Sequence, residues 1–260
     1  MRVDVRMRAY LLGELRVIVN GRLVDTTSSR RSRNLIAYLL AHRDAAVPRD
    51  VLIDTFWPKA RPDAARNSLH VALSGARRVL REASAEQIIE RRPDAYRIVR
   101  SVEVWTDVDE FERSCQAARR ADATGDRAAA IRHYEAAGLL FRGAFLADEP
   151  YADWVLPRRE TLRALALEAQ SRLVALYTER GDHGPAATLA RRVLADDPCN
   201  EDVHRGLMVC YARTGLRHLA LLQYRQLATT LWDDLRVRPS EETTELFERL
   251  RRPEAISRPA

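Results

Sequence analysis

A period of about 34 residues runs through the second half of this chain. Gly181 and Gly215 have this spacing, and so do four further pairs, Leu173 with Leu207, Tyr177 with Tyr211, Ala187 with Leu221, and Ala190 with Tyr224. An earlier copy begins at Gly125-Asp126. Because one helix pair of this length cannot bury its own apolar face, successive copies have to stack on one another. The second half is therefore expected to be an array of helix pairs.

The repeat period is that of tetratricopeptide helix pairs, which present concave surfaces to peptides and proteins and seldom carry catalysis. We expect an all-α, tetratricopeptide-like repeat domain over residues 103–253 and a flexible tail over 254–260. Aromatic residues in the connecting segment, Phe145, Tyr151 and Trp154, are expected in the core rather than in a site.

Charge divides the chain unevenly. Residues 1–100 hold 20 Lys and Arg against 11 Asp and Glu, a net charge of +9, whereas the remaining 160 residues have a net charge of −3. A basic first part followed by a slightly acidic second part indicates that only the first part meets a polyanion. The boundary is expected near residue 102.

The first part alternates short strands with helices. Residues 9–24 are typical of strands, with Asn20-Gly21 as a tight hairpin turn. A helix is predicted from about Arg30 to His42, with Ser28 or Ser29 as its cap. Pro48 is expected in the first turn of a second helix that ends at Trp57-Pro58.

A third helix, predicted from Asp63 to about Glu82, has two distinct faces. At about 100° per residue, its apolar side chains fall in one arc, which is expected to be core: Ala65, Leu69, Ala72, Leu73, Ala76, Val79 and Leu80. The opposite arc is polar and rich in arginine: Arg66, Asn67, His70, Ser74, Arg77, Arg78 and Arg81. Val71 lies within or beside this polar arc.

The polar arc has the side chains that read DNA bases. Arginine can pair with both acceptors of guanine, asparagine can do the same to adenine, and an apolar residue such as Val71 can contact a thymine methyl group. The alternative is a solvated helix face, but such faces normally mix both signs of charge. Only Glu82 interrupts the stretch from Ala64 to Ala83 with an acid, which favours DNA reading.

A basic hairpin is predicted after the third helix. Ile88-Ile89 and Tyr96 to Val99 are typical of two strands joined around Arg91-Arg92-Pro93-Asp94. Strands, three helices and a basic hairpin in this order indicate a winged helix-turn-helix domain over residues 1–102. Its third helix would enter the major groove, and its wing residues Arg91, Arg92 and Tyr96 would touch the backbone or the adjacent minor groove. The fold class is thus mainly α with small β elements.

Nearly the whole chain, about residues 9 to 250, resembles the SARP family (Streptomyces antibiotic regulatory proteins). The resemblance rests on ordered segments: LLGELRVIVNGRLV, Phe56-Trp57-Pro58, Arg66-Asn67-Ser68-Leu69, Arg77-Arg78-Val79-Leu80, the wing Arg92 to Arg97, and the junction Trp105-Thr106-Asp107-Val108-Asp109-Glu110-Phe111. It implies an OmpR-type winged helix, the output domain of two-component-like phosphorelays, followed by a bacterial transcriptional activation domain. It further implies binding to tandem direct repeats of double-stranded DNA near the −35 region, self-association on DNA, recruitment of the RNA polymerase holoenzyme including its sigma factor, and control of an antibiotic gene cluster.

Two positions depart from the family pattern. Gly75 stands where the family often has arginine, so a contact to DNA is expected to be missing, and glycine inside a helix costs about 1 kcal/mol relative to alanine. The wing has Asp94-Ala95-Tyr96 where Gly-Tyr is commoner, which is expected to alter the turn.

Other functions have weaker support. A protein-interaction scaffold would bind DNA without sequence preference, and a repressor could use the same DNA-binding fold. For an enzyme or metal protein, the only cluster is Cys199, His204 and Cys210, whose spacing fits no common zinc pattern. We expect no catalytic residues, no metal and no cofactor; no GxxxxGK[ST] motif or receiver domain is found. With no signal peptide or membrane span predicted, we expect a cytoplasmic, nucleoid-associated protein that binds no membrane.

Overall fold

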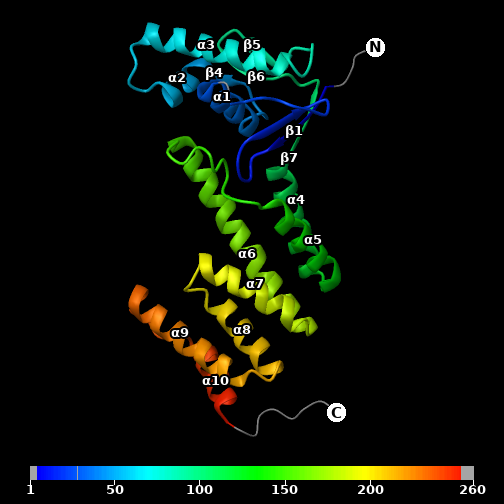
Figure 1. Cartoon of the computed structure of the whole chain (residues 1–260), viewed down its shortest axis with the longest axis vertical. Coiled ribbons are helices and arrows are strands. Elements are labelled where there is room, and N and C mark those ends of the chain that lie inside the picture. The colour runs from blue at the N-terminus through cyan, green and yellow to red at the C-terminus, as the bar shows by residue number, and fades with distance from the viewer. Residues whose placement is uncertain (1–4, 28, 253–260) are drawn as a thin grey trace. The chain divides into compact units, whose positions relative to one another are not determined.

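The computed structural model describes residues 5–27 and 29–252, and the expected tail 254–260 lies outside them. Its contacts group into two compact units. The first unit comprises Met1–Glu112 with Leu140–Leu162, and the second comprises Arg113–Leu139 with Arg163–Ala260. Figure 1 follows the order of the elements along the chain. No helix within the described residues is long and apolar enough to cross a membrane.

A four-stranded sheet opens the first unit. It consists of β1 (Val5–Tyr10), β2 (Arg16–Val19), β3 (Arg22–Leu23) and β7 (Val102–Thr106) in the order β3-β2-β1-β7. The β2–β3 turn is the predicted one, since Asn20 and Gly21 have φ angles of 50° and 81°. β7 returns from beyond the wing and runs parallel to β1. The strand pairing thus brings together segments about a hundred residues apart in the sequence.

Three helices follow the first strands: α1 (Arg30–Ala41), α2 (Arg49–Phe56) and α3 (Pro62–Arg81). Ser29 caps α1 by accepting a hydrogen bond from the Ser32 amide, as predicted, while Ser28 lies outside the described residues. The expectation that Pro48 belongs to the first turn of α2 is wrong. Pro48 ends the short strand β4 (Val47–Pro48) and is the N-cap residue of α2, because β4 pairs with the later strand β6.

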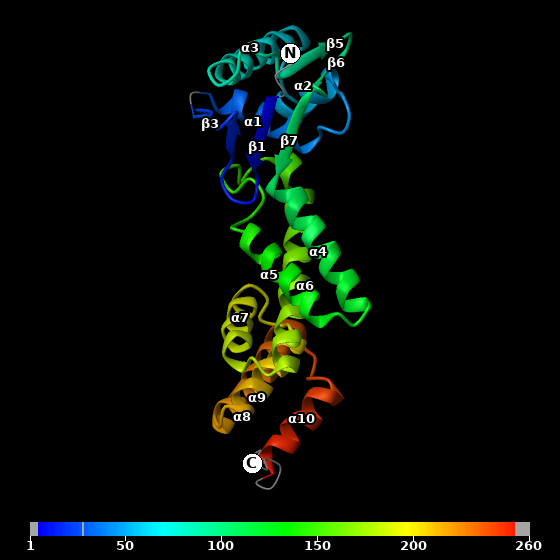
Figure 2. The same ribbon diagram turned by 90° about the vertical axis from the view of Figure 1, so that its right-hand side faces the viewer.

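The wing is a three-stranded sheet in the order β4-β6-β5, with β5 spanning Ile89–Arg92 and β6 spanning Ala95–Ile98. Figure 2 shows the β5–β6 hairpin beside α3. The buried residues of α3 are the seven that helical spacing predicts: Ala65, Leu69, Ala72, Leu73, Ala76, Val79 and Leu80. Helix α3 therefore keeps its polar face free of the core.

Residues from beyond the wing complete the first unit. Asp107, at the start of α4 (Asp107–Ala123), is almost fully buried and accepts hydrogen bonds from the amides of Leu11 and Leu12 at 2.7 and 3.0 Å. Burial raises the pKa of Asp107, and these hydrogen bonds partly offset the rise. Further along, Phe145 forms a β-bridge with Leu12. These contacts attach the sheet to the segments around residues 107 and 145.

Ion pairs hold the same region to α1. Glu149, with a side chain 3% exposed, accepts a hydrogen bond from Arg30 at 2.9 Å, and Asp148 pairs with Arg33. The predicted core position is confirmed for Phe145, which is buried, and Trp154 is half-buried against Tyr38. For Tyr151 the prediction is wrong, since its side chain is 88% exposed in the turn before η1 (Asp153–Val155).

The second unit is the predicted array of helix pairs. Beside most of α4 it contains α5 (Arg127–Leu140), most of α6 (Leu156–Arg180), α7 (His183–Asp196), α8 (Glu201–Arg213), α9 (Arg217–Leu235) and α10 (Glu241–Arg251). Gly125, Gly181 and Gly215 each have φ between 80° and 89°. After each glycine, the next amide donates to the carbonyl five residues earlier, at 2.9, 2.9 and 2.8 Å. The three turns are copies of one helix-ending motif.

A buried histidine joins two helices of this unit. His204 on α8 donates from Nε2 to the carbonyl of Pro198 at 3.0 Å, and Nδ1 accepts from the Gln223 amide of α9 at 2.7 Å. The bond that Nδ1 accepts requires the neutral ring. Burial lowers the pKa of His204 below its ordinary value of 6.5, and the bond to the Pro198 carbonyl offsets part of this shift.

We expect this histidine to make the stability of the second unit depend on pH. A depressed pKa in the folded state means that the unfolded chain binds the proton more tightly, so stability is lost as the pH falls below about 6.5. Urea unfolding between pH 7.5 and 5 measures this loss, and His204→Gln should flatten it. The exposed His218→Gln variant is the control; equal pH dependence in His204→Gln and the wild type would contradict the assignment.

Candidate nucleic-acid interface

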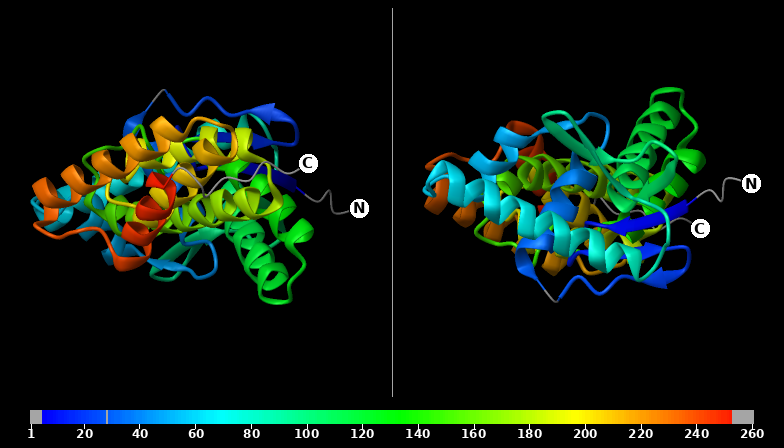
Figure 3. Two further views of the ribbon diagram at one scale, coloured as in Figure 1. Left: turned by 90° about the horizontal axis from the view of Figure 1, so that it is seen from below. Right: turned by 90° about the horizontal axis from the view of Figure 1, so that it is seen from above.

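Helix α3 presents one continuous polar face to solvent. Its exposed residues on this face are Arg66, Asn67, His70, Val71, Ser74, Arg78 and Arg81. Seen from above, α3 lies in front of the other elements of the first unit (Figure 3, right). Val71 is 72% exposed although it is apolar. An apolar group held in water among arginines is available for contact with a thymine methyl group.

The positive charge of this face is largely unneutralised. Arg66 lies 3.5 Å from Asp63 in a surface ion pair, and such a pair contributes little to the stability of the fold. Among the described residues, no carboxylate forms an ion pair with Arg78 or Arg81. A face of this charge attracts a polyanion.

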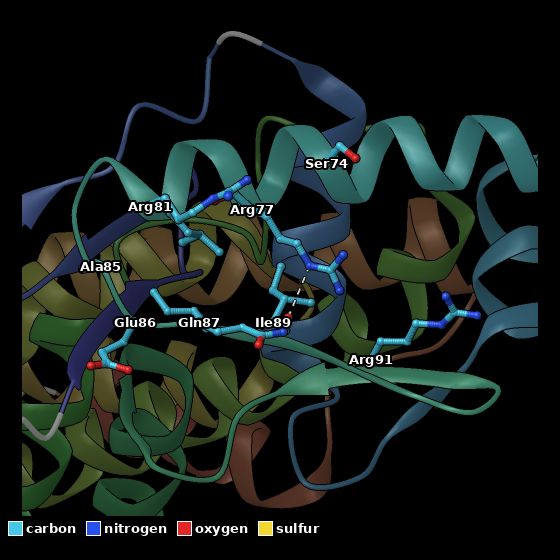
Figure 4. Close-up of a pocket in the computed structure, with 10 residues that line it drawn as sticks. Ser74, Arg77, Arg81, Ala85, Glu86, Gln87, Ile89 and Arg91 are labelled. Carbon is cyan, nitrogen blue, oxygen red and sulfur yellow. Dashed lines mark hydrogen bonds between the residues drawn. The ribbon is translucent and has the colours of Figure 1, made fainter. Parts of the chain in front are cut away.

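Arg77 differs from its neighbours on α3. It is half-buried, and its Nε donates to the carbonyl of Ile89 on β5 at 3.3 Å (Figure 4). The same carbonyl accepts a second hydrogen bond, from Gln87 Nε2 at 2.9 Å. Arg77 thus links the helix to the wing and is not free on the helix surface, which the helical spacing alone did not indicate.

The wing places two of its three predicted residues in solvent. Arg91 and Arg92 are exposed near the end of β5, and Arg92 lies 3.2 Å from Glu90. A hydrogen bond from Arg97 lowers the pKa of Glu90, so that carboxylate is already neutralised within the wing. Tyr96 is 3% exposed, and its prediction as a DNA contact is wrong. Side chains alternate across β6, and Tyr96 lies on the side that faces the core.

Gly75 has a packing role that the family comparison did not suggest. A Cβ atom at this position would lie 2.3 Å from the hydroxyl oxygen of Ser32 on α1, and this hydroxyl donates to the carbonyl of Ala72 at 3.0 Å. Gly75 therefore lies where α1 and α3 cross closely. Its location explains the glycine without reference to a DNA contact.

We expect Gly75→Ala to have two opposing effects. Alanine raises the helix propensity of α3, but its Cβ atom clashes with the hydroxyl oxygen of Ser32. In a Ser32→Ala background the clashing oxygen is gone, so Gly75→Ala should stabilise the protein by up to about 1 kcal/mol. In the wild-type background the gain should be smaller or reversed. Thermal unfolding of the four variants measures the difference, and identical effects in both backgrounds would argue against the contact.

Sequence reasoning missed the neighbours of α3 that come from other segments. Ser29 and Ser32 of α1 border a surface depression with His70, Val71 and Arg78, and Gln87 lies between α3 and β5. Side-chain periodicity describes one helix or strand at a time, so it does not predict which residues of other segments will pack beside that element. The candidate metal cluster is not assembled: Cys199 faces Asp234, His204 is bonded as described above, and Cys210 lies beside Thr178. The described residues hold no group of three or more potential ligands.

Two family descriptions match the chain on either side of residue 102. "Bacterial transcriptional activator domain" matches residues 106–251, and "Transcriptional regulatory protein, C terminal" matches residues 24–98. The chain belongs to the SARP family of transcriptional regulators. Both matched domains, the winged helix and the helical activator domain, thus lie in this one chain.

Named relatives support this membership. The chain is 26% identical to the transcriptional regulatory protein MoaR1 of Mycobacterium tuberculosis over 93% of its own length and 78% of that protein. It is 30% identical to the regulatory protein AfsR of Streptomyces griseus over 98% of its length, but this covers only 26% of AfsR. A solved structure of Mycobacterium tuberculosis EmbR, in complex with a low-affinity phosphopeptide, has a TM-score of 0.81 at 26% identity. That match covers 95% of this chain and 65% of EmbR. Both AfsR and EmbR therefore contain parts that this SARP chain does not match.

Proposed function

We propose that this SARP regulator binds tandem direct repeats near the −35 region of its promoters and activates transcription by recruiting the RNA polymerase holoenzyme. One observation carries the proposal. Helix α3 exposes arginine, asparagine and an apolar residue together on one uncovered face, and these are the side chains that distinguish bases in the major groove.

Roles follow from position along α3. Arg66, Asn67, His70 and Val71 lie in its first half, where residues of a recognition helix meet base edges. Ser74 lies at its middle, and Arg78 and Arg81 near its end are assigned to phosphates, which fix the register of the protein on DNA. Arg91 and Arg92 act from the wing on the backbone or the adjacent minor groove.

The activator domain supplies the second half of the proposal. With domains over 1–102 and 103–253, one part holds DNA while the repeats offer helical surface to a neighbouring protomer or to the polymerase with its sigma factor. Protomers on direct repeats stand head to tail on one face of the duplex, spaced by whole turns of about 10–10.5 bp. We place the protein on the nucleoid and, following the family, assign it to a secondary-metabolite gene cluster.

In vitro transcription from a promoter with two repeats upstream of −35 tests activation. The protein should raise transcript yield, and an insertion of roughly 5 bp between the repeats should abolish the gain because it rotates one protomer by half a turn. An insertion of about 10 bp is the control and should restore most of it. A lower transcript yield on the intact promoter would identify a repressor. An equal yield with both insertions would contradict the proposal that two protomers act together on one face of the DNA.

A further inference from the structure

The four-stranded sheet of the first unit has one face directed away from the core. On β1 the side chains of Val5, Met7 and Ala9 are buried, whereas Arg6 and Arg8 between them are exposed. Because residues paired across strands lie on the same side of a sheet, the strand register defines the other members of the exposed side. This side, the outer sheet face, consists of Arg6, Arg8, Tyr10, Arg16, Ile18, Leu23, Glu103 and Trp105. Figure 2 shows the strands that carry it, from β3 to β7.

A row of apolar side chains crosses the middle of the outer sheet face. Arg8 is paired with Ile18 of β2 on one side and with Trp105 of β7 on the other, and Ile18 is paired in turn with Leu23 of β3. Leu23 is 69% exposed, and Ile18 and Trp105 are half-buried. Single apolar residues are common on protein surfaces, but a contiguous group rimmed by polar residues is typical of an interaction site.

The positive charge beside this row has no acidic partner. Within the described part of the chain, no ion pair or hydrogen bond involves the guanidinium groups of Arg8, Arg16 or Arg142. Glu103 is the one acidic residue on the four strands, and it already pairs with Arg6 at 3.4 Å. The outer sheet face therefore carries net positive charge that is available to an acidic partner.

Two of these arginines lie against an aromatic ring. The guanidinium carbons of Arg16 and Arg142 are 4.8 and 5.5 Å from the centre of the Tyr10 ring. The Trp105 ring meets the Tyr10 ring edge-on, with 5.4 Å between the ring centres. Tryptophan, tyrosine and arginine are the side chains that dominate the binding energy of protein interfaces. Their combination with an apolar row favours a protein as the occupant, since the DNA backbone offers charge to arginine but no apolar side chains.

We propose that the outer sheet face docks an acidic amphipathic helix of a partner protein. A helix is the element that packs on the face of a sheet, and its apolar stripe would cover the row of Leu23, Ile18 and Trp105. Carboxylates beside that stripe would pair with the three arginines that lack an acidic partner. This contact is additional to those assigned above to the helical repeats, and it does not depend on DNA binding.

A labelled peptide tests the contact. The probe is a helix-forming peptide of about 18 residues with leucines at helical spacing and glutamates on both sides of them. Fluorescence anisotropy measures its binding to the full chain. The wild type should bind the probe, and Arg8→Glu and Leu23→Ser should each weaken binding by about tenfold or more. Both side chains are exposed, so the fold should be unchanged.

Arg22→Glu is the matched control. It changes the net charge as Arg8→Glu does, but Arg22 is paired with Val19, whose side chain is buried on the other side of the sheet. This variant should bind the probe like the wild type. A second peptide with glutamine in place of every glutamate should bind the wild type at least about tenfold more weakly. No binding of the acidic probe by the wild type, or an equal loss in Arg8→Glu and Arg22→Glu, would overturn the proposal.

The same two variants test other occupants of the face. If DNA passed over it, Arg8→Glu would weaken binding to a random duplex more than Arg22→Glu does. If a second copy of the chain covered it, sedimentation would show a wild-type oligomer that Arg8→Glu dissociates. Either result would overturn the proposal. Equal DNA affinities and an unchanged oligomeric state, with the loss of peptide binding confined to Arg8→Glu, would support it.

Discussion

Asp107→Ala should lower the free energy of unfolding of the first unit by about 2–6 kcal/mol. The carboxylate accepts hydrogen bonds from two buried amides, those of Leu11 and Leu12, and alanine leaves both without an acceptor. Each buried unsatisfied donor costs about 1–3 kcal/mol. Chemical denaturation followed by circular dichroism and tryptophan fluorescence measures the loss. Asp107→Asn, which keeps one acceptor oxygen, should fall between alanine and wild type.

The control for this variant is Glu103→Gln on the adjacent strand β7. Glu103 pairs with Arg6 at 3.4 Å, but both side chains are more than 70% exposed, so the change should cost no more than about 1 kcal/mol. If Asp107→Ala is as mild as Glu103→Gln, the start of α4 does not anchor the sheet. The expected difference would show that residues from the activator domain are part of the folded DNA-binding unit.

Arg66→Ala and Asn67→Ala should each weaken operator binding by about 1–3 kcal/mol while leaving random DNA almost unaffected. Both side chains are exposed on α3 and neither supports the core, so the fold should be unchanged. Competition binding with operator and random duplexes, at one salt concentration, measures the two affinities. Equal losses on both duplexes would make these residues phosphate contacts and contradict base reading.

Ser68→Ala is the matched control for those two variants. Ser68 lies between Asn67 and the buried Leu69 and is half-buried on α3. Its replacement keeps the helix and its charge, so operator binding should stay within about 0.5 kcal/mol of the wild type. A loss as large as that of Asn67→Ala would point to a general disturbance of the helix.

The elements of this protein were largely predictable from its sequence. The seven core residues of α3 follow from helical spacing, and the β2–β3 turn follows from Asn20-Gly21. The turns at Gly181 and Gly215 follow from the 34-residue spacing of these glycines. Each of these signals is local, because side-chain periodicity and backbone conformation are properties of a short segment.

The predictions that failed concern contacts between distant segments. Tyr96 was expected at DNA from its place in a basic hairpin, yet the alternation of β6 directs it into the core. The sequence also predicts Tyr151 in the core, but its side chain is exposed. At Gly75 the sequence indicates a missing DNA contact, whereas the structure shows a close contact with Ser32 of α1. A short segment does not contain the information on what will pack against it, so such contacts had to come from the structure.

The measurement we would make first is footprinting of the purified protein on sheared DNA from its host at about 150 mM salt, read by sequencing. At this salt concentration non-specific phosphate contacts are weakened, so sequence preference stands out. We predict a small number of strongly protected sites, each with head-to-tail repeats upstream of a gene cluster. Uniform weak protection, or none, would contradict sequence-specific recognition by α3.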